Sequence, residues 1–186
     1  MGEETTLDKI KADLRFYAEA DRQPLTALFA LRMFLLTPGF QFVFSLRVMQ
    51  FVGKIPIIGR GSRRLVSWAN RLIFGSEVEV ATEIAGGLYV PHPFGIIVAC
   101  ARIGRKVMIL QNVAIGKLGG GGGHAVIEDG VEVYAGAVVG DVTLGRNSKV
   151  GANSVVISDV PAGATAVGVP ARIILPKQKP NFVGTA

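Results

Sequence analysis

This sequence has one cysteine, few charged residues and no metal-binding motif. These features argue against an internal disulfide, a disordered chain and a bound metal. Cys100 is the single cysteine among 186 residues, so no disulfide can form within the chain and a reducing compartment is favoured. The cysteine and histidine spacings that bind metals are absent, so we expect no metal cofactor. Only 18% of the residues are charged while 49% are hydrophobic, which predicts a folded chain rather than a disordered one.

Long uninterrupted apolar runs are absent as well. The segment from Ala27 to Val52 is interrupted by Arg32, Pro38, Gly39 and Arg47, whereas a membrane-spanning helix needs about 20 consecutive apolar residues. We therefore expect no transmembrane helix, and a helix lying on the membrane surface remains open. The acidic, polar start MGEETTLDKI predicts no secretory signal peptide. We expect a cytoplasmic protein, with peripheral contact at the inner face of the cell membrane as the open alternative.

The sequence is basic, with a net charge of +6 and a pI near 9.8. This balance favours an anionic partner such as a membrane surface or a phosphorylated ligand. No basic run with interleaved aromatic residues resembles a nucleic-acid module, so we expect no nucleic-acid partner. Much of the excess lies in the first half, at Arg47, Lys54, Arg60, Arg63, Arg64 and Arg71.

Residues 1–75 predict a helical region. Thr5 with Asp8 has the pattern of a capping box, Pro24 suits the first position of a second helix, and Thr37-Pro38-Gly39 should end that helix. The middle helices are apolar nearly all round, so they must pack on each other, on a neighbouring subunit or on lipid. Further helices are expected from Phe40 to Val52 and, with Ser62 as cap, from Arg63 to Phe74.

From residue 76 to 175 the sequence repeats every six residues. An aliphatic residue recurs at one position of the repeat, which we call the beat, and small residues lie between these positions. This pattern is typical of a parallel β-helix, in which each aliphatic side chain points inward and stacks on its equivalent one coil away. Three six-residue units per coil give roughly four to five coils, and residues 176–186 should form a loose tail. The residues on the beat are Val78, Ile84, Val90, Ile96, Ile103, Ile109, Ile115, Ile127, Val133, Val139, Leu144, Val150 and Val156.

Two histidines lie where the beat is interrupted. His92 stands between two prolines, and His124 follows the glycine run Gly119–Gly123 in a loop that we place at Lys117 to Ala125. A neutral imidazole is the side chain best suited to take a proton from an alcohol at neutral pH. Cys100 is expected to be a packed side chain rather than a nucleophile, and Tyr89 and Tyr134 are expected on the outer face.

Several segments together resemble the hexapeptide-repeat acyltransferases, specifically the serine acetyltransferase branch. The resemblance extends from Thr37 to Ile173, with segments in matching order and spacing. The segments that carry it are TPGFQ (37–41), PHPFGI (91–96), ILQNVAIG (109–116), GHAVIEDGVEV (123–133) and DVPAGATAVGVPARI (159–173).

The resemblance implies a mainly β protein, a left-handed parallel β-helix that forms a homotrimer and uses acetyl-CoA as co-substrate. By this resemblance, His92 is the general base and Glu77 is the carboxylate that orients it. His124 completes the active site from the adjoining subunit. The thioester is already activated, so no covalent intermediate is needed, and backbone amides or His124 can stabilise the oxyanion. Acetyl-CoA is expected in the groove between subunits, at Ala135, Gly136, Gly151, Ala152 and Arg172.

Two departures from the serine branch shape the expected acceptor. That branch has Asp before the first histidine and Arg before the second, where this sequence has Pro91 and Gly123. Neither residue can bind the charged groups of serine through a side chain. Glu77 and the PHP setting of His92 look like the polysaccharide-cluster relatives, including the colanic acid acetyltransferases.

We therefore expect an O-acetyltransferase acting on a sugar hydroxyl in surface polysaccharide assembly, with a sugar or glycan as acceptor and its linkage to a lipid left open. Two alternatives remain open. One is a serine O-acetyltransferase of cysteine biosynthesis, and the other is a non-catalytic β-helix that binds a partner without turnover.

Overall fold

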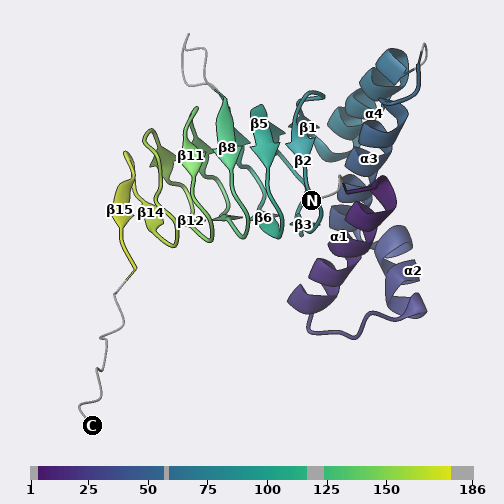
Figure 1. Ribbon diagram of the computed structural model, residues 1–186, viewed down its shortest axis with the longest axis horizontal. Helices are drawn as coiled ribbons and strands as arrows, with labels where there is room; N and C mark the ends of the chain where they lie inside the picture. The colour runs from purple at the N-terminus through teal and green to yellow at the C-terminus, as the bar shows by residue number, and fades with distance from the viewer. Residues whose placement is uncertain (1–3, 57–58, 117–123, 177–186) are drawn as a thin grey trace.

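The computed structural model describes residues 4–56, 59–116 and 124–176, and it consists of a helical region followed by a parallel β-helix (Figure 1). The boundary lies between Phe74, where the last helix ends, and Glu77, where the first strand begins. The helices cover one end of the β-helix, so they close the end of a core that each coil otherwise shares with its neighbours. The C-terminal tail expected at residues 176–186 lies outside the described residues from 177 on.

The part of the chain that the structure describes contains four helices, which are α1 (Thr6–Ala20), α2 (Ala27–Leu36), α3 (Pro38–Val52) and α4 (Gly59–Phe74). The capping box predicted for α1 is confirmed, because the Thr5 hydroxyl accepts from the Asp8 amide while the Asp8 carboxylate accepts from the Thr5 amide. Pro24 is not the first residue of α2, which begins at Ala27 with Thr26 as its cap.

The segment Thr37-Pro38-Gly39 ends α2 as expected and also starts α3, because Pro38 is the first residue of that helix. Proline suits this position, since its missing N–H would have no partner there. The prediction that α4 starts at Arg63 was wrong, as the helix begins at Gly59. Among the described residues no single helix is long and apolar enough to cross a membrane, although α2 and α3 together pass that test with an 87° bend between them.

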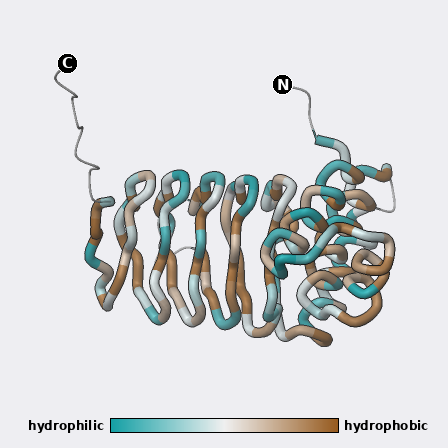
Figure 2. The backbone as a smooth tube through the Cα atoms, turned by 90° about the horizontal axis from the view of Figure 1, so that it is seen from below, coloured by the Kyte–Doolittle hydropathy of each residue, from teal (hydrophilic) through white to brown (hydrophobic). Residues whose placement is uncertain are grey.

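In the described residues, fifteen short strands form three sheets, which are the three faces of the β-helix. Figure 2 shows the successive coils side by side, with the helices at one end. The first sheet has the order β1-β4-β7-β10-β13, the second β11-β8-β5-β2 and the third β15-β14-β12-β9-β6-β3. All pairs are parallel except β14 with β15. The strands are β1 (Glu77–Val78), β2 (Glu83–Ile84), β3 (Leu88–Tyr89), β4 (Ile97–Val98), β5 (Cys100–Ile103), β6 (Val107–Ile109), β7 (Ala114–Ile115), β8 (Ala125–Ile127), β9 (Glu132–Val133), β10 (Val138–Val139), β11 (Thr143–Leu144), β12 (Lys149–Val150), β13 (Val155–Val156), β14 (Thr165–Val167) and β15 (Arg172–Ile174).

The six-residue beat is confirmed, because every residue predicted to point inward is buried. In the first sheet, Val78, Val98, Ile115, Val139 and Val156 occupy equivalent positions in five successive strands. Each coil therefore buries its aliphatic residues only against the coils on either side. The five strands of this sheet agree with the expected number of coils.

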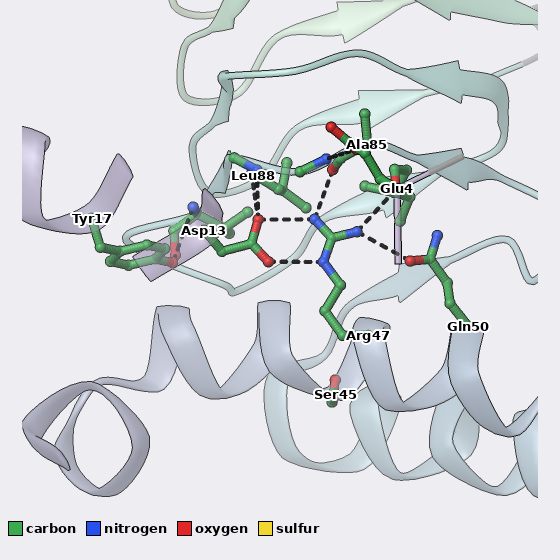
Figure 3. Close-up of polar contacts among 12 residues, drawn as sticks. Glu4, Asp13, Tyr17, Ser45, Arg47, Gln50, Ala85 and Leu88 are labelled. Atoms are coloured by element: carbon green, nitrogen blue, oxygen red, sulfur yellow. Dashed lines mark hydrogen bonds and ion pairs between the residues drawn. The ribbon is translucent and has the colours of Figure 1, made fainter. Parts of the chain in front are cut away.

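A buried ion pair joins the helical region to the first coil (Figure 3). The Arg47 guanidinium in α3 donates to both carboxylate oxygens of Asp13 in α1, at 2.8 and 2.9 Å. Its remaining N–H groups donate to the Gln50 side chain and to the carbonyl oxygens of Ile84 and Ala85. Every donor of the guanidinium is thus satisfied, as a buried charge requires.

The Asp13 carboxylate completes this network on the β-helix side. It accepts the backbone amides of Gly87 and Leu88 at 2.8 and 2.9 Å, immediately before and within β3. Arg47 was counted among the basic residues of the first half of the sequence, and its side chain is fully buried. The pair instead fixes α1 and α3 against the start of the third sheet.

Candidate active site

The three site residues expected from the sequence lie on two edges of the β-helix. His92 follows β3 and precedes β4, so it lies where the third sheet turns into the first, an edge that we call the His92 edge. His124 directly precedes β8, where the first sheet turns into the second, and we call this the His124 edge. Both imidazoles are exposed. One face of the β-helix therefore separates the two histidines within a single chain.

The turn that carries His92 is braced from the helical region. The Tyr17 hydroxyl in α1 donates to the Val90 carbonyl at 2.9 Å and accepts from the Val90 amide at 3.2 Å. Burial raises the pKa of Tyr17 well above its usual value, so the phenol stays protonated and acts as a fixed hydrogen-bonding group. These contacts hold the strand two residues before the imidazole.

Gly39, the third residue of the TPGFQ segment, packs directly against the same turn. A Cβ atom at this position would lie 2.0 Å from the Val90 carbonyl oxygen and 3.0 Å from the Pro91 oxygen. Any side chain here would therefore displace either α3 or the residues leading to His92. This contact gives a structural reason for a glycine at the start of α3.

Ser76 fixes the other side of the turn. Its buried hydroxyl donates to the Pro93 carbonyl at 2.7 Å and accepts from the Ile96 amide at 2.9 Å. Because Ser76 immediately precedes β1, these bonds place Glu77 one coil below the turn that carries His92. The Glu77 carboxylate is ion-paired with Arg71 of α4, and no hydrogen bond between Glu77 and His92 is found in the described part of the chain.

The small residues expected to bind acetyl-CoA lie along the same edge as His92. Successive turns are linked by backbone bonds from Asn112 to Phe94, from Gly136 to Gln111 and from Asn153 to Ala135. Ala135 and Gly136 follow β9, and Gly151 and Ala152 follow β12, so each pair occupies the turn from the third sheet into the first. Arg172 is exposed in β15, beyond the last of these turns.

Two glycines on this edge are required for different reasons, Gly136 by its backbone conformation and Gly151 by a neighbouring side chain. Gly136 has a φ of +72°, a region that residues with a Cβ atom rarely adopt. A Cβ atom on Gly151 would lie 2.8 Å from the Val167 side chain. The edge therefore presents little side-chain bulk, which allows a long, narrow ligand to approach the backbone.

Gln111 is a residue of this edge that the sequence analysis missed. Its side-chain oxygen Oε1 is buried, and no hydrogen-bond partner for it is found in residues 4–56, 59–116 and 124–176. A buried amide oxygen without a partner is costly, so it marks a place where a ligand or a second copy can supply a donor. The quoted segment ILQNVAIG contained this residue, but its spacing did not indicate burial.

Other expectations about individual side chains can be compared with the structure. Cys100 is buried, and burial raises the pKa of its thiol to about 12, so it is a packed side chain and not a nucleophile. Tyr134 lies on the outer face beside Glu132, whereas Tyr89 is half-buried against Phe16 and Tyr17. The loop expected at Lys117 to Ala125 lies outside the described residues from 117 to 123, and Ala125 is already a buried residue of β8.

The chain matches known proteins in sequence and in structure. Residues 124–158 match the family model described as bacterial transferase hexapeptide (six repeats). A serine acetyltransferase from Synechococcus elongatus is 34% identical over 171 residues, which cover 89% of this chain and 67% of the relative.

Two solved structures extend the comparison. The serine acetyltransferase of Neisseria gonorrhoeae in complex with serine has a TM-score of 0.76 at 30% identity, with 91% of this chain and 69% of that chain covered. A serine acetyltransferase in complex with CoA has a TM-score of 0.78 at 30% identity, with the same coverage. The chain thus spans about two thirds of the length of these proteins.

These comparisons overturn the sugar acceptor that we expected. That expectation rested on Pro91 and Gly123, whereas relatives matched across most of the chain are serine acetyltransferases. The similarity over most of the chain is stronger evidence for the acceptor than the two positions beside the histidines. The charged groups of a substrate can also be bound by other elements or by a second subunit. The chain belongs to the hexapeptide-repeat acyltransferases with a left-handed parallel β-helix, the family that includes the serine acetyltransferases.

Proposed function

We propose that the protein transfers the acetyl group of acetyl-CoA to the hydroxyl of L-serine, the reaction that leads toward cysteine. The observation that carries this proposal is the position of His92, an exposed imidazole in a turn that Tyr17, Gly39 and Ser76 brace. The relatives and the solved complexes with serine and with CoA support the choice of both substrates.

His92 acts as general base in this proposal. Its neutral imidazole takes the proton of the serine hydroxyl as the oxygen attacks the thioester carbonyl. The tetrahedral intermediate then collapses, the carbon–sulfur bond breaks, and the leaving thiolate receives that proton from the imidazolium. The products are O-acetylserine and CoA, and no enzyme nucleophile is needed because the thioester is already activated.

Glu77 is proposed to orient the His92 imidazole and to stabilise its charged form. In the single chain its carboxylate is bound to Arg71, so this role requires the carboxylate to turn from α4 toward the edge. Glu77 lies one coil below the turn that carries His92, because Ser76 beside it is bonded to that turn. A change in the pH profile of kcat in Glu77→Gln, larger than the change in the KM for acetyl-CoA, would separate orientation from a structural role.

The complete site is proposed to form between two copies in a homotrimer. His92 and His124 lie at opposite edges of the first sheet, so a single chain cannot bring them together. A ring of three copies would place the His92 edge of one copy against the His124 edge of the next, a head-to-tail contact that closes on itself. His124 then completes the site from the neighbouring subunit.

Acetyl-CoA is proposed to lie along the His92 edge. Ala135, Gly136, Gly151 and Ala152 would let the pantetheine arm approach the backbone, and Arg172 would face the phosphates at the far end. Use of acetyl-CoA, together with the free Cys100 thiol, supports a location in the cytoplasm.

Release of the CoA thiol tests the proposal directly. The protein with acetyl-CoA should release thiol rapidly when L-serine is added and slowly without an acceptor. His92→Ala should lose at least about a hundredfold in kcat, the usual contribution of a general base, and should still bind acetyl-CoA. Thiol release that is no faster with L-serine than without it would refute the serine acceptor, and an unchanged kcat in His92→Ala would refute the role of His92 and favour a binding scaffold.

A further inference from the structure

The helix α4 is amphipathic, but it is oriented opposite to the usual arrangement. The residues it buries are Gly59, Ser67, Asn70 and Phe74, of which only the last is a large apolar side chain. Asn70 accepts a hydrogen bond from Ser45 of α3 at 2.8 Å, so the polar side of the helix is fixed against the protein. A surface helix normally turns its apolar stripe toward the core.

The apolar side of α4 faces outward. Leu65, Trp68, Leu72 and Ile73 form what we call the outer face of α4, and they are exposed by 63, 57, 65 and 66%. Leu65, Trp68 and Leu72 are spaced by three and four residues, so they lie on one side of the helix. Four large apolar side chains at one place on a helix indicate a surface that another molecule covers.

Arginines border this outer face. Arg60, Arg64 and Arg71 are exposed and form a stripe along the side of the helix next to Trp68, and the sequence of α4 contains no acidic residue. Arg71 is paired with Glu77 of β1, so within the described residues Arg60 and Arg64 carry the unpaired charge of this stripe. A basic stripe that adjoins Trp and Leu side chains is typical of a helix lying in the headgroup region of a membrane. Tryptophan is also enriched at this depth, where its ring is partly wet.

We infer that the outer face of α4 is a docking surface for an anionic phospholipid bilayer. The charge of the helix argues against a contact in which the α4 helix of a second copy covers this face. Contact between two α4 helices would bring their arginines together and repel, whereas an anionic headgroup layer attracts them. The helix lies in the plane of the surface and does not need to cross it.

This surface lies next to the candidate active site but does not depend on it. The helix α4 leads directly into β1, and Phe74 at its end contacts Phe94, two residues after His92, with ring centroids 6.5 Å apart. Docking through α4 would therefore hold the first coil close to the membrane. The inference stands on the exposure and charge of α4 whether or not L-serine is the acceptor.

Trp68 makes a direct test possible, because it is the only tryptophan in the chain. The whole protein is titrated with vesicles of phosphatidylcholine alone and with vesicles containing phosphatidylglycerol. Trp68 emission should shift to shorter wavelength with the anionic vesicles and stay nearly unchanged with the neutral ones. Unchanged emission with anionic vesicles, or an equal shift with both, would overturn the inference.

Variants test separately the apolar and the basic side chains of the outer face of α4. Leu65→Ser with Leu72→Ser should weaken binding to anionic vesicles by more than about tenfold, because two leucines that the bilayer would bury are lost. Arg60→Gln with Arg64→Gln should weaken it by about 25-fold, since each arginine near an anionic surface contributes roughly fivefold. All four side chains are exposed, so folding should be retained, as far-UV circular dichroism can verify.

The matched control removes the same charge elsewhere. Arg15→Gln with Arg146→Gln changes two exposed arginines outside α4 and should leave vesicle binding nearly unchanged. An equal loss in the two arginine pairs would mean that overall charge, and not α4, governs binding. If Leu65→Ser with Leu72→Ser instead lowers the oligomer mass and leaves vesicle binding unaffected, the outer face is a contact between copies and the inference fails.

Discussion

The β-helix and the helical region are stabilised in different ways. In the β-helix, the same contact between inward aliphatic side chains is repeated from coil to coil. In the helical region, contacts occur once, as in the network of Arg47 with Asp13. A repeated contact spreads stability over many small contributions, whereas a single buried ion pair concentrates it in two side chains.

The largest effect should follow from breaking that single contact. Arg47→Met leaves the Asp13 charge buried without its partner, which should cost about 3–5 kcal/mol. In urea, the transition followed by Trp68 fluorescence should move to lower concentration more than the transition followed by the β-sheet signal in circular dichroism. Asp13→Leu with Arg47→Met should lose less stability than Arg47→Met alone, and a larger loss in the double variant would contradict this account.

The contact between Gly39 of the helical region and Val90 of the β-helix should matter more for catalysis than for stability. In Gly39→Ala the new methyl group meets the Val90 carbonyl, so the turn carrying His92 must shift. A shift on the order of 1 Å can lower kcat by about a hundredfold, which the thiol-release assay measures. Gly61→Ala is the control, since nothing lies within 4 Å of its added Cβ atom, and an equal effect of the two substitutions would contradict the role of Gly39.

A single repeated contact in the β-helix should contribute less. Ile127→Val removes one methylene from a fully buried position and should lower the free energy of unfolding by about 1 kcal/mol. Ile174→Val, at a half-exposed position of β15, should change it by well under that amount. Urea unfolding of both variants gives the comparison, and equal losses would mean that Ile127 does not share the close packing of the coils.

The smallest effect is expected from an ion pair on the surface of the β-helix. Burial raises the pKa of Glu132, but hydrogen bonds from Tyr134 and Lys149 outweigh it and leave the pKa below its ordinary value. A lowered pKa contributes stability above the pKa of the unfolded chain, and that contribution disappears as the pH falls through the pKa of the folded state. For this exposed pair it should stay below about 1 kcal/mol.

Unfolding of the parent protein and of Glu132→Gln at two pH values measures that contribution. The parent should be slightly more stable at pH 7, and the difference should disappear as the pH falls through the lowered pKa of Glu132 in the folded state. A difference that persists at low pH would mean that the amide alters packing instead of charge.

The same contrast explains what the sequence could predict. The thirteen residues on the beat were found because repetition places each at an equivalent position, so Val133 and Leu144 follow the rule that places Ile115. His92 and its neighbours were found because they interrupt that rule. The roles of Tyr17, Ser76 and Gly39 were not found, because their contacts join residues far apart in the chain and leave no local pattern.

The acceptor was predicted wrongly because a local departure in the sequence was given too much weight. The expectation of a sugar rested on Pro91 and Gly123, whereas in the proposed trimer, groups from other elements and from a second copy can bind a small zwitterion. The orientation of α4 was also invisible, because its amphipathic pattern shows two faces without saying which one meets the core.

The central claim is that the active site is built from the His92 edge of one copy and the His124 edge of the next. His92→Ala and His124→Ala should each lose most of their thiol release with L-serine. Co-expressed as mixed trimers, they should regain about a quarter of the parent activity, since about three quarters of random trimers are mixed and each then holds one intact site of three. A mixture no more active than either variant alone would contradict the claim.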